Sequence, residues 1–328
     1  MQIYNNAPDA AAKKLGWTVI PAVASGPAPG SISQQLTDIN TLLTEGVNVL
    51  AINPCDSQSI IPAVTKANSQ HVPVILTDTG TLGGVAINVA ANEIQSGQLA
   101  CQGMIDGLKA QHNGQVSGTV IQIQGDIAGT AGQDRTKGFV DCMQSNAPNV
   151  KIVTDPTKWD PQSATSELRI SLSAMPDTVG VYMQSDTQFW TGTQQVMQSL
   201  GLLHKRGEPG HVVVIGIDGG GGTLHGVQQG YVDADVSQPK TGYFNIGLFF
   251  LKQAQNGTLA KVNPADYKKY NLDVSYKPSG GGLWVLAPST LVTSANATDS
   301  ALWGNATCDK DATTCPTSLD SLASAVKA

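Results

Sequence analysis

Short apolar segments alternate with amphipathic helical patterns along most of this chain, and this alternation limits the fold more than any other feature. The segments that indicate strands are 17–23, 47–53, 72–78, 118–125, 150–154, 179–184 and 211–218. Helical periodicity is found in 10–15, 31–44, 57–70, 94–110, 133–144, 163–175, 192–200 and 223–229. Strands that are apolar throughout are typical of parallel sheets covered by helices on both faces. The order predicts two similar α/β lobes in series.

Length and composition agree with this prediction and exclude some functions. The 328 residues fit two domains of ordinary size. Only 13% of the residues are charged, and the net charge of −6 comes without any long basic run. A nucleic-acid backbone needs a basic surface, so we exclude nucleic acid as a partner. No apolar stretch approaches the roughly 20 residues that cross a bilayer.

The five cysteines indicate disulfides rather than a metal site. They form no CxxC pair, and no two histidines are four residues apart, so we expect no metal. Cys308 and Cys315 enclose a short polar loop that suits a disulfide and an oxidising compartment. Cys101 and Cys142 are candidates for a second disulfide, and Cys55 is then left as a small loop residue.

The two ends of the chain suggest export. The first 14 residues lack the basic start and apolar core of a signal peptide. We therefore expect the natural N-terminus to lie upstream, as a signal or lipoprotein segment, and the protein to be periplasmic or extracellular. Beyond Gly280 the strand and helix pattern fades, and 294–328 is rich in Ala, Thr, Ser, Asp and Asn. We expect this part to be a tail held by the Cys308–Cys315 loop.

Polar residues follow the predicted strands. Ligands of open parallel sheets bind beyond the carboxyl ends of the strands. Those ends carry Asn53, Asp78, residues 125–130, Trp159 with Asp160, Ser185 with Asp186, and Asp218 with Gly219–Gly222. Short amides and carboxylates hydrogen-bond vicinal hydroxyls, and an aromatic face packs on a sugar ring. Any one of these residues could instead cap a helix or shape a turn. Their joint occurrence at six strand ends favours a site for a sugar or polyol.

Catalytic motifs are incomplete or absent in the sequence. Gly220 and Gly222 follow a strand, but His225 stands where a dinucleotide fingerprint has its third glycine. Neither a G-x-S-x-G elbow nor a phosphate loop occurs. Asp78 and Asp218 could in principle exchange protons, but no nucleophile, metal or cofactor signal accompanies them. We expect a protein that is not an enzyme and needs no cofactor.

Several motifs resemble those of the ribose-binding-like periplasmic proteins of ABC importers, from about Ala10 to about Gly257. They are KKLGWTVI, TEGVNVLAINPCDSQSIIPAVTKAN with VPVILTD, GDIAGTAGQDRTKGF, MQSD and VVVIGIDG. The resemblance implies the type I periplasmic binding protein fold, in which two Rossmann-like α/β lobes with parallel sheets are joined by a three-segment hinge. The implied division is 1–89 with 239–265 for the N-terminal lobe, 90–238 with 266–292 for the C-terminal lobe, and 293–328 for an extension.

The resemblance also implies the ligand contacts and the partners. The implied contacts are Asn53, Asp78, Thr79, Arg135, Trp159, Ser185, Asp218 and Gln238. The protein would bind a sugar or polyol in the cleft between the lobes, close on it, and deliver it as a monomer to the permease of an ABC importer. We expect ligand to raise the melting temperature and to reduce the radius in solution.

The sequence departs from the family pattern at several positions. Thr79 stands where the family has Arg, Ser185 where it has Asn, and Trp159 where it has Phe. The changes at Thr79 and Ser185 suggest a wider pocket, with Trp190 either filling part of it or packing in the core, and they argue against ribose itself. The first strand of the first lobe is also missing from the pattern, and 283–292 is a candidate to replace it.

Two other functions remain open from the sequence. The same fold and many of these motifs occur in the ligand-sensing domains of regulators and chemoreceptor systems. An enzyme that uses Gly219–Gly222 for a nucleotide is a weaker alternative.

Overall fold

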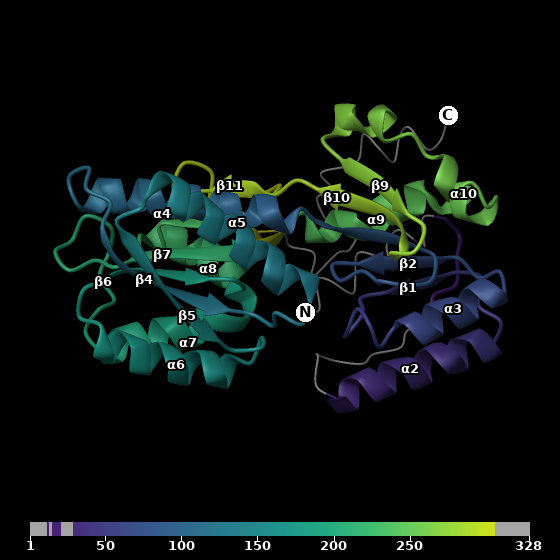
Figure 1. The fold of residues 1–328 in the computed structure, drawn as a ribbon, viewed down its shortest axis with the longest axis horizontal. Helices are drawn as coiled ribbons and strands as arrows, with labels where there is room; N and C mark the ends of the chain where they lie inside the picture. The colour runs from purple at the N-terminus through teal and green to yellow at the C-terminus, as the bar shows by residue number, and fades with distance from the viewer. Residues whose placement is uncertain (1–11, 13–14, 21–28, 306–328) are drawn as a thin grey trace. The chain divides into compact units, whose positions relative to one another are not determined.

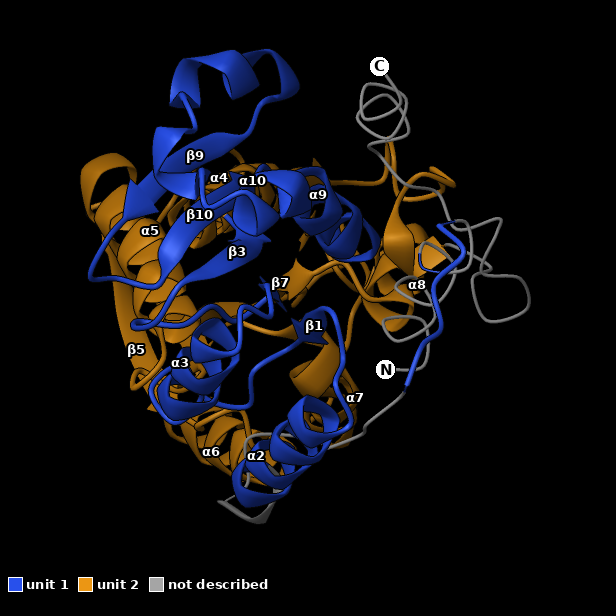
Figure 2. Cartoon of the chain, turned by 90° about the vertical axis from the view of Figure 1, so that its right-hand side faces the viewer, with its two compact units in different colours: residues 1–91, 239–288, 307–328 blue, residues 92–238, 289–306 orange. Residues whose placement is uncertain are grey.

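The computed structural model describes residues 12, 15–20 and 29–305, and the chain divides into two compact units (Figures 1 and 2). Unit 1 contains the described residues up to Ala91 together with 239–288. Unit 2 contains 92–238 and the described residues from Ser289 onward. The two α/β units with mostly parallel sheets confirm the predicted fold class.

Unit 1 is built on a five-stranded sheet in the order β1-β2-β3-β10-β9. The strands are β1 (Leu50–Ile52), β2 (Val74–Thr77), β3 (Ala86–Ala91), β9 (Asp273–Lys277) and β10 (Gly282–Ala287). All of the pairings are parallel except that of β9 with β10. The helices are α2 (Pro29–Thr44), α3 (Ile61–Ser69), α9 (Tyr243–Phe249) and α10 (Leu251–Gln255), with 3-10 turns at Lys240–Gly242, Leu259–Lys261 and Pro264–Tyr270.

Apolar side chains cover both faces of the unit 1 sheet. Val74 and Leu76 share a buried cluster with Ile39 of α2 and Val64 of α3. The intervening Ile75 belongs to a different cluster, which includes residues of α9. Successive side chains of a strand point to opposite faces, so a strand between two helical layers must be apolar throughout. This is the physical reason why VPVILTD lacks a polar alternation.

Unit 2 is built on a six-stranded sheet in the order β11-β8-β7-β6-β4-β5, in which β11 is antiparallel to β8. The strands are β4 (Gly118–Gln124), β5 (Val150–Pro156), β6 (Thr178–Met183), β7 (Val213–Asp218), β8 (Ala234–Ser237) and β11 (Thr290–Val292). The helices are α4 (Glu93–Gln111), α5 (Thr130–Asn146), α6 (Pro161–Ala174), α7 (Asp186–Ser199) and α8 (Gly221–Gln229), with a 3-10 turn at Trp303–Asn305.

Helices α4 and α5 pack closely against each other and are linked covalently. A disulfide joins Cys101 of α4 to Cys142 of α5, with the two Cα atoms 6.1 Å apart. This confirms the second predicted pairing. A Cβ atom on Gly97 would lie 2.4 Å from the Arg135 carbonyl oxygen, and one on Gly138 would lie 2.1 Å from that of Ile94. Glycine at both positions therefore allows α5 to approach α4, which fixes the position of Arg135.

The N-terminal predictions are tested only in part. Residues 17–20 are irregular, which contradicts a strand beginning at Trp17, and the rest of the predicted strand and most of the 10–15 helix lie outside the described residues. In the sheet as described, β1 is an edge strand. The segment 283–292 does not replace a strand beside β1, because β10 lies between β3 and β9.

The expectation that regular structure fades after Gly280 was wrong, since β10 and β11 both lie beyond it. Gly281 and Gly282 both have φ of +93°, a conformation that glycine adopts readily, and they lead the chain from β9 back along β10. A hairpin returns to its own sheet, so residues 266–288 belong to unit 1, whereas the sequence assigned 266–292 to the second lobe. Ala297 and Leu302 lie in the core of unit 2, so residues 293–305 are not an external extension.

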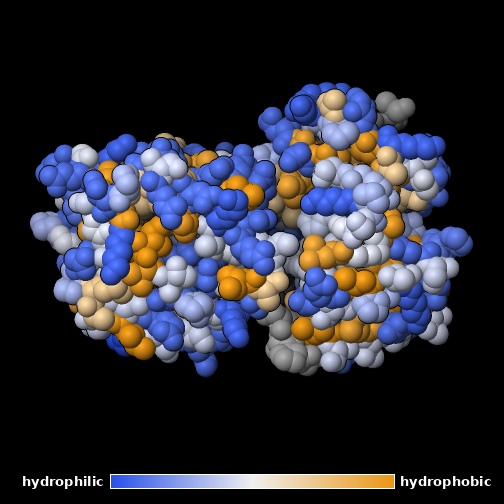
Figure 3. All heavy atoms as spheres, viewed as in Figure 1, coloured by the Kyte–Doolittle hydropathy of each residue, from blue (hydrophilic) through white to orange (hydrophobic). Residues whose placement is uncertain are grey.

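The described residues contain no helix that is both long and apolar enough to cross a bilayer. The face drawn in Figure 3 mixes hydrophilic and hydrophobic residues, as a surface with few charged groups should. The predicted Cys308–Cys315 disulfide lies outside the described residues.

Candidate ligand-binding site

The carboxyl ends of the parallel strands of unit 2 place most of the predicted contacts at one edge of its sheet. Strands β4, β6, β7 and β8 are parallel, and they end at Gln124, Met183, Asp218 and Ser237. Because neighbouring parallel strands end at the same edge, the residues that follow them come together there. Ser185, Asp218 and Gln238 are three of the residues brought together in this way.

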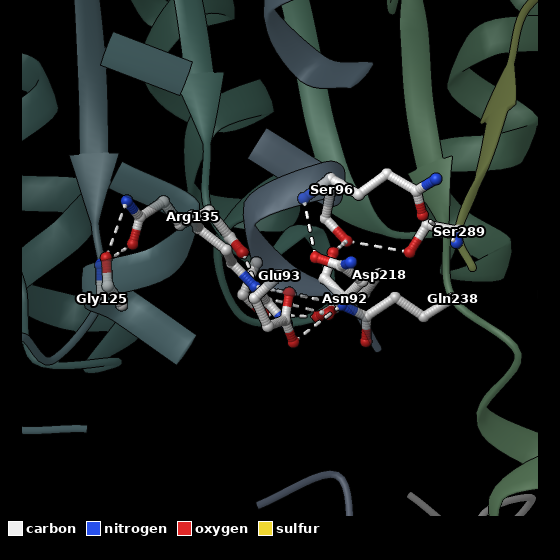
Figure 4. A network of polar contacts seen from close by, with 12 residues as sticks. Asn92, Glu93, Ser96, Gly125, Arg135, Asp218, Gln238 and Ser289 are labelled. Atoms are coloured by element: carbon white, nitrogen blue, oxygen red, sulfur yellow. Dashed lines mark hydrogen bonds and ion pairs between the residues drawn. The ribbon is translucent and has the colours of Figure 1, made fainter. Parts of the chain in front are cut away.

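Arg135 is the centre of a buried ionic network at this edge (Figure 4). Its Nε and Nη2 atoms donate to the two carboxylate oxygens of Glu93, over 2.7 and 2.8 Å. Its Nη1 atom donates to the carbonyl oxygen of Gln184 and lies 3.4 Å from an oxygen of Asp218. The side chains of Arg135, Glu93 and Asp218 are all less than a tenth exposed. The arrangement is a two-point pair of the kind that fixes a guanidinium most firmly.

Glu93 was not predicted from the sequence, although it is one of the most highly bonded groups here. It is the first residue of α4, and the side chain of Asn92 caps the helix by accepting from the Gln95 amide. A carboxylate at a helix N-terminus is favoured by the helix dipole. Gln238 donates to both carboxylate oxygens of Glu93, over 3.1 and 3.0 Å. The Asn-Glu pair at a helix start was the one sequence signal that could have identified it.

Asp218 is held in a fixed orientation at the end of β7. One of its carboxylate oxygens accepts hydrogen bonds from the hydroxyls of Ser185 and Thr187, over 2.6 and 2.7 Å. The backbone carbonyl oxygen of Asp218 accepts hydrogen bonds from the backbone N–H of Gln238 and from the indole N–H of Trp303. Trp303 was also missed, because it lies in a segment whose composition suggested a tail. The hydroxyls of Ser185 and Thr187 therefore set the orientation of the carboxylate.

Trp159 presents an aromatic surface beside the guanidinium. The indole is half-buried, and the centroids of the Trp159 and Phe189 rings are 6.3 Å apart with nearly parallel planes. The Arg135 Cζ atom lies 5.6 Å from the Trp159 ring centroid, a distance at which a cation and an indole attract each other. A Cβ atom on Gly125 would lie only 2.1 Å from the indole, so any larger residue there would displace the ring. By contrast, Trp190 is buried in the core.

Unit 1 carries the other predicted contacts at the corresponding edge of its own sheet. Asn53 follows β1 and is exposed, whereas Asp78 and Thr79 follow β2 and are half-buried. Strands β1 and β2 are parallel neighbours, with Ile52 opposite Leu76, so Asn53 and Asp78 lie near each other at one edge. The Asp78 amide donates to the Val89 carbonyl over 2.8 Å. A ligand role for these three residues stays a prediction.

Three of the predicted contact residues have an unusual backbone conformation. Asp78, Trp159 and Asp218 have φ of +67°, +63° and +127°. Positive φ is uncommon for residues other than glycine, and such strain is concentrated at functional sites. The three residues come from two different sheets, and in each case the unusual residue follows or ends a parallel strand.

The glycine run after β7 has a structural explanation. One oxygen of Asp186 accepts from the amides of Gly219 and Gly220, over 3.0 and 2.8 Å. A Cβ atom on Gly220 would lie 2.8 Å from the other oxygen of Asp186. The backbone N–H groups of Gly219 and Gly220 therefore bind the carboxylate of the buried Asp186. A phosphate-binding loop would need these same N–H groups for its ligand.

A second buried carboxyl group lies next to Asp186. Asp235 is fully buried, and burial together with the charge of Asp186 raises the pKa of Asp235 well above the usual value for Asp. A protonated Asp235 can donate a hydrogen bond to Asp186, which lets the two groups share one proton. Such a pair satisfies buried oxygens without requiring two adjacent negative charges.

Two α/β units whose sheets carry polar strand ends define the architecture of a two-lobed binding protein. A family model described as periplasmic binding protein domain matches residues 1–258, and the chain belongs to this family of solute-binding proteins. The ribose import binding protein RbsB of Salmonella typhimurium is 29% identical over 229 residues, which cover 69% of this chain and 71% of that protein.

Two further relatives come from mycobacteria. The xylitol-binding protein of Mycolicibacterium smegmatis is 25% identical over 258 residues, or 76% of this chain and 69% of that protein. A solved ABC transporter solute binding protein from Mycobacterium smegmatis, with bound glycerol, is 26% identical. The two structures align over 90% of each chain with a TM-score of 0.72. The family and this neighbour establish the type I periplasmic binding protein fold.

Proposed function

We propose that this chain is an extracytoplasmic solute-binding protein that captures a neutral sugar or polyol and delivers it to an ABC importer. The observation that carries the proposal is the buried cluster of Glu93, Arg135, Asp218 and Gln238 beside the face of Trp159. Its groups are held in place by one another, so they need little rearrangement to bind. Preorganisation of this kind lowers the entropic cost of binding a small polar molecule.

The chemistry of the cluster suits a molecule with several hydroxyls. Carboxylates accept hydrogen bonds from hydroxyls, amides and guanidinium groups donate to them, and the charged groups make the stronger bonds. The indole of Trp159 offers an apolar surface for the C–H face of a sugar or the carbon chain of a polyol. In unit 1 we propose Asn53, Asp78 and Thr79 as further contacts.

The relatives support this class of ligand without naming the ligand of this chain. One is named for ribose import, one for xylitol, and one solved structure contains glycerol. Thr79 and Ser185 are shorter than the Arg and Asn that the sequence pattern leads us to expect, so fewer groups reach into the site. We infer that the ligand is a polyol or a sugar other than ribose.

The partner and the location are inferred from the same relatives. One relative is named as a ribose import protein and the solved neighbour as an ABC transporter solute binding protein, so we propose an ABC permease as the partner. We also propose a monomer as the working form. The disulfide between Cys101 and Cys142 is consistent with a periplasmic or extracellular location, where thiols are oxidised. None of the relatives named above is a regulator, and the packing of Gly219–Gly222 on Asp186 argues against a nucleotide site.

A binding screen with two matched variants tests the proposal. Pure protein is heated in the presence of pentoses, hexoses and polyols, and any ligand that raises the melting temperature is measured by calorimetry. Asp218→Asn weakens a hydrogen bond to a charged group, so we expect affinity to fall about 10-fold or more. Asp106→Asn is the control, because Asp106 is exposed on α4 and should leave affinity unchanged. Equal losses in both variants, or no response to any compound, would contradict the proposal.

A further inference from the structure

The ionic network contains more negative than positive charge. One guanidinium, that of Arg135, faces two carboxylates, those of Glu93 and Asp218. Both carboxylates accept hydrogen bonds from N–H or O–H donors, which favour the ionised form. These three side chains together therefore carry a net negative charge, although one of them is an arginine.

The guanidinium is directed toward protein acceptors on two sides. The Nε and Nη2 side, which forms the fork that binds carboxylates and phosphates, holds Glu93 in a two-point pair. The Nη1 atom donates to the Gln184 carbonyl and faces Asp218. An anionic ligand that sought Arg135 would have to displace Glu93 from the fork. It would then leave a buried carboxylate without its partner, which is strongly unfavourable.

A neutral ligand meets no such obstacle. A hydroxyl can donate to an oxygen of Glu93 or Asp218 while the ion pair stays intact, because each carboxylate offers about four acceptor positions. The side-chain amide of Gln238 also donates to both carboxylate oxygens of Glu93, which restricts the movement of that carboxylate.

We propose that Glu93 is a specificity-determining residue, which makes the site accept neutral sugars and polyols and reject the corresponding acids and phosphates. This inference rests on the proposed function, since it concerns the same site. Glu93 occupies the Nε and Nη2 donors of Arg135, and this occupation excludes carboxylate and phosphate ligands.

Paired ligands that differ only in charge test the inference. Calorimetry at pH 7.5 and moderate salt compares the best neutral ligand of the screen with its own carboxylic acid or phosphate. D-galactose with D-galacturonate and glycerol with glycerol 3-phosphate are compared in the same way. We expect the wild-type protein to bind each acid or phosphate at least 10-fold more weakly than its neutral partner. In Glu93→Gln, which keeps the shape but removes the charge, this ratio should fall at least 10-fold.

Two further variants separate charge from structure. Glu93→Asp retains the charge and should retain the rejection of anions. Glu167→Gln makes the same charge change at an exposed position of α6 and should leave the ratio at its wild-type value. A shift in the ratio between two ligands is not produced by general destabilisation, which weakens both.

The outcomes distinguish the two proposals. If the wild-type protein binds no neutral sugar or polyol, the proposed function fails, and this inference fails with it. If the wild-type protein binds a neutral compound and its acid equally well, the inference alone is overturned, even if Glu93→Gln does not fold. An unchanged ratio in a folded Glu93→Gln variant overturns it as well.

Discussion

The disulfide between Cys101 and Cys142 joins the two helices that position Glu93 and Arg135, and its removal should have a measurable cost. Cys101 is completely buried, so alanine is the better replacement because serine would bury a hydroxyl. We predict that Cys101→Ala/Cys142→Ala folds but that its unit 2 is clearly less stable than that of the oxidised wild-type protein.

The size of the effect follows from the length of the closed loop. The two cysteines are 41 positions apart. In the chain-entropy description, a loop of about 40 residues stabilises the folded state by about 4 kcal/mol at 25 °C. For a domain of roughly 150–250 residues, each kcal/mol corresponds to about 2–4 °C, so the melting temperature should fall by about 8–16 °C.

Urea unfolding followed by circular dichroism measures this loss, and scanning calorimetry gives the change in melting temperature. Treatment of the wild-type protein with a reductant should reproduce the behaviour of the double variant. Cys55→Ala is the matched control, because Cys55 lies in unit 1 and takes no part in the disulfide.

A loss of less than about 1 kcal/mol in the free energy of unfolding would refute the reasoning, since disulfides typically contribute about 2–4 kcal/mol. An equal loss in Cys55→Ala would also refute it, because the effect would then not belong to the closed loop.

Two further predictions concern the strand ends of unit 2. Burial, and then the charge of Asp186, raises the pKa of Asp235, so the stabilisation from protonated Asp235 is complete at low pH and is lost as pH rises through the folded-state pKa. Asp235→Asn should therefore flatten the fall in stability as the pH rises above the ordinary Asp value of 3.8 and be the more stable protein at the alkaline end, as measured by urea unfolding; a slope equal to that of the wild-type protein would contradict this. Gly125→Ala would place a Cβ atom 2.1 Å from Trp159, so we expect a displaced indole, a cost of about 1–3 kcal/mol and weaker ligand binding by calorimetry; unchanged affinity would show that the indole does not contact the ligand.

The parallel strands could be predicted from the sequence because their signal is local. A strand such as β2 is apolar over its whole length, since both of its faces are covered, and helices with clear periodicity flank it. The β9–β10 hairpin could not be assigned in this way. Gly282 of β10 pairs with Ala86 of β3, far away in the sequence, and no local pattern reveals which sheet accepts a strand.

The site was predicted in part for a similar reason. The carboxyl ends of strands are visible in the sequence, which led to Trp159, Ser185 and Asp218. Glu93 begins a helix and Trp303 lies in a segment of tail-like composition, so neither stands directly at the carboxyl end of a parallel strand of unit 2. Their roles depend on tertiary contacts, with Arg135 in one case and with the carbonyl of Asp218 in the other.

The measurement that tests the central claim most directly is titration calorimetry of the pure protein with neutral sugars and polyols. We predict saturable one-site binding to at least one of them. At a ligand concentration of 100 times Kd, we also predict stabilisation by about 2.7 kcal/mol, which appears as a higher melting temperature. The absence of both heat and stabilisation across the whole panel at millimolar concentration would contradict the claim that this chain is a binding protein for such molecules.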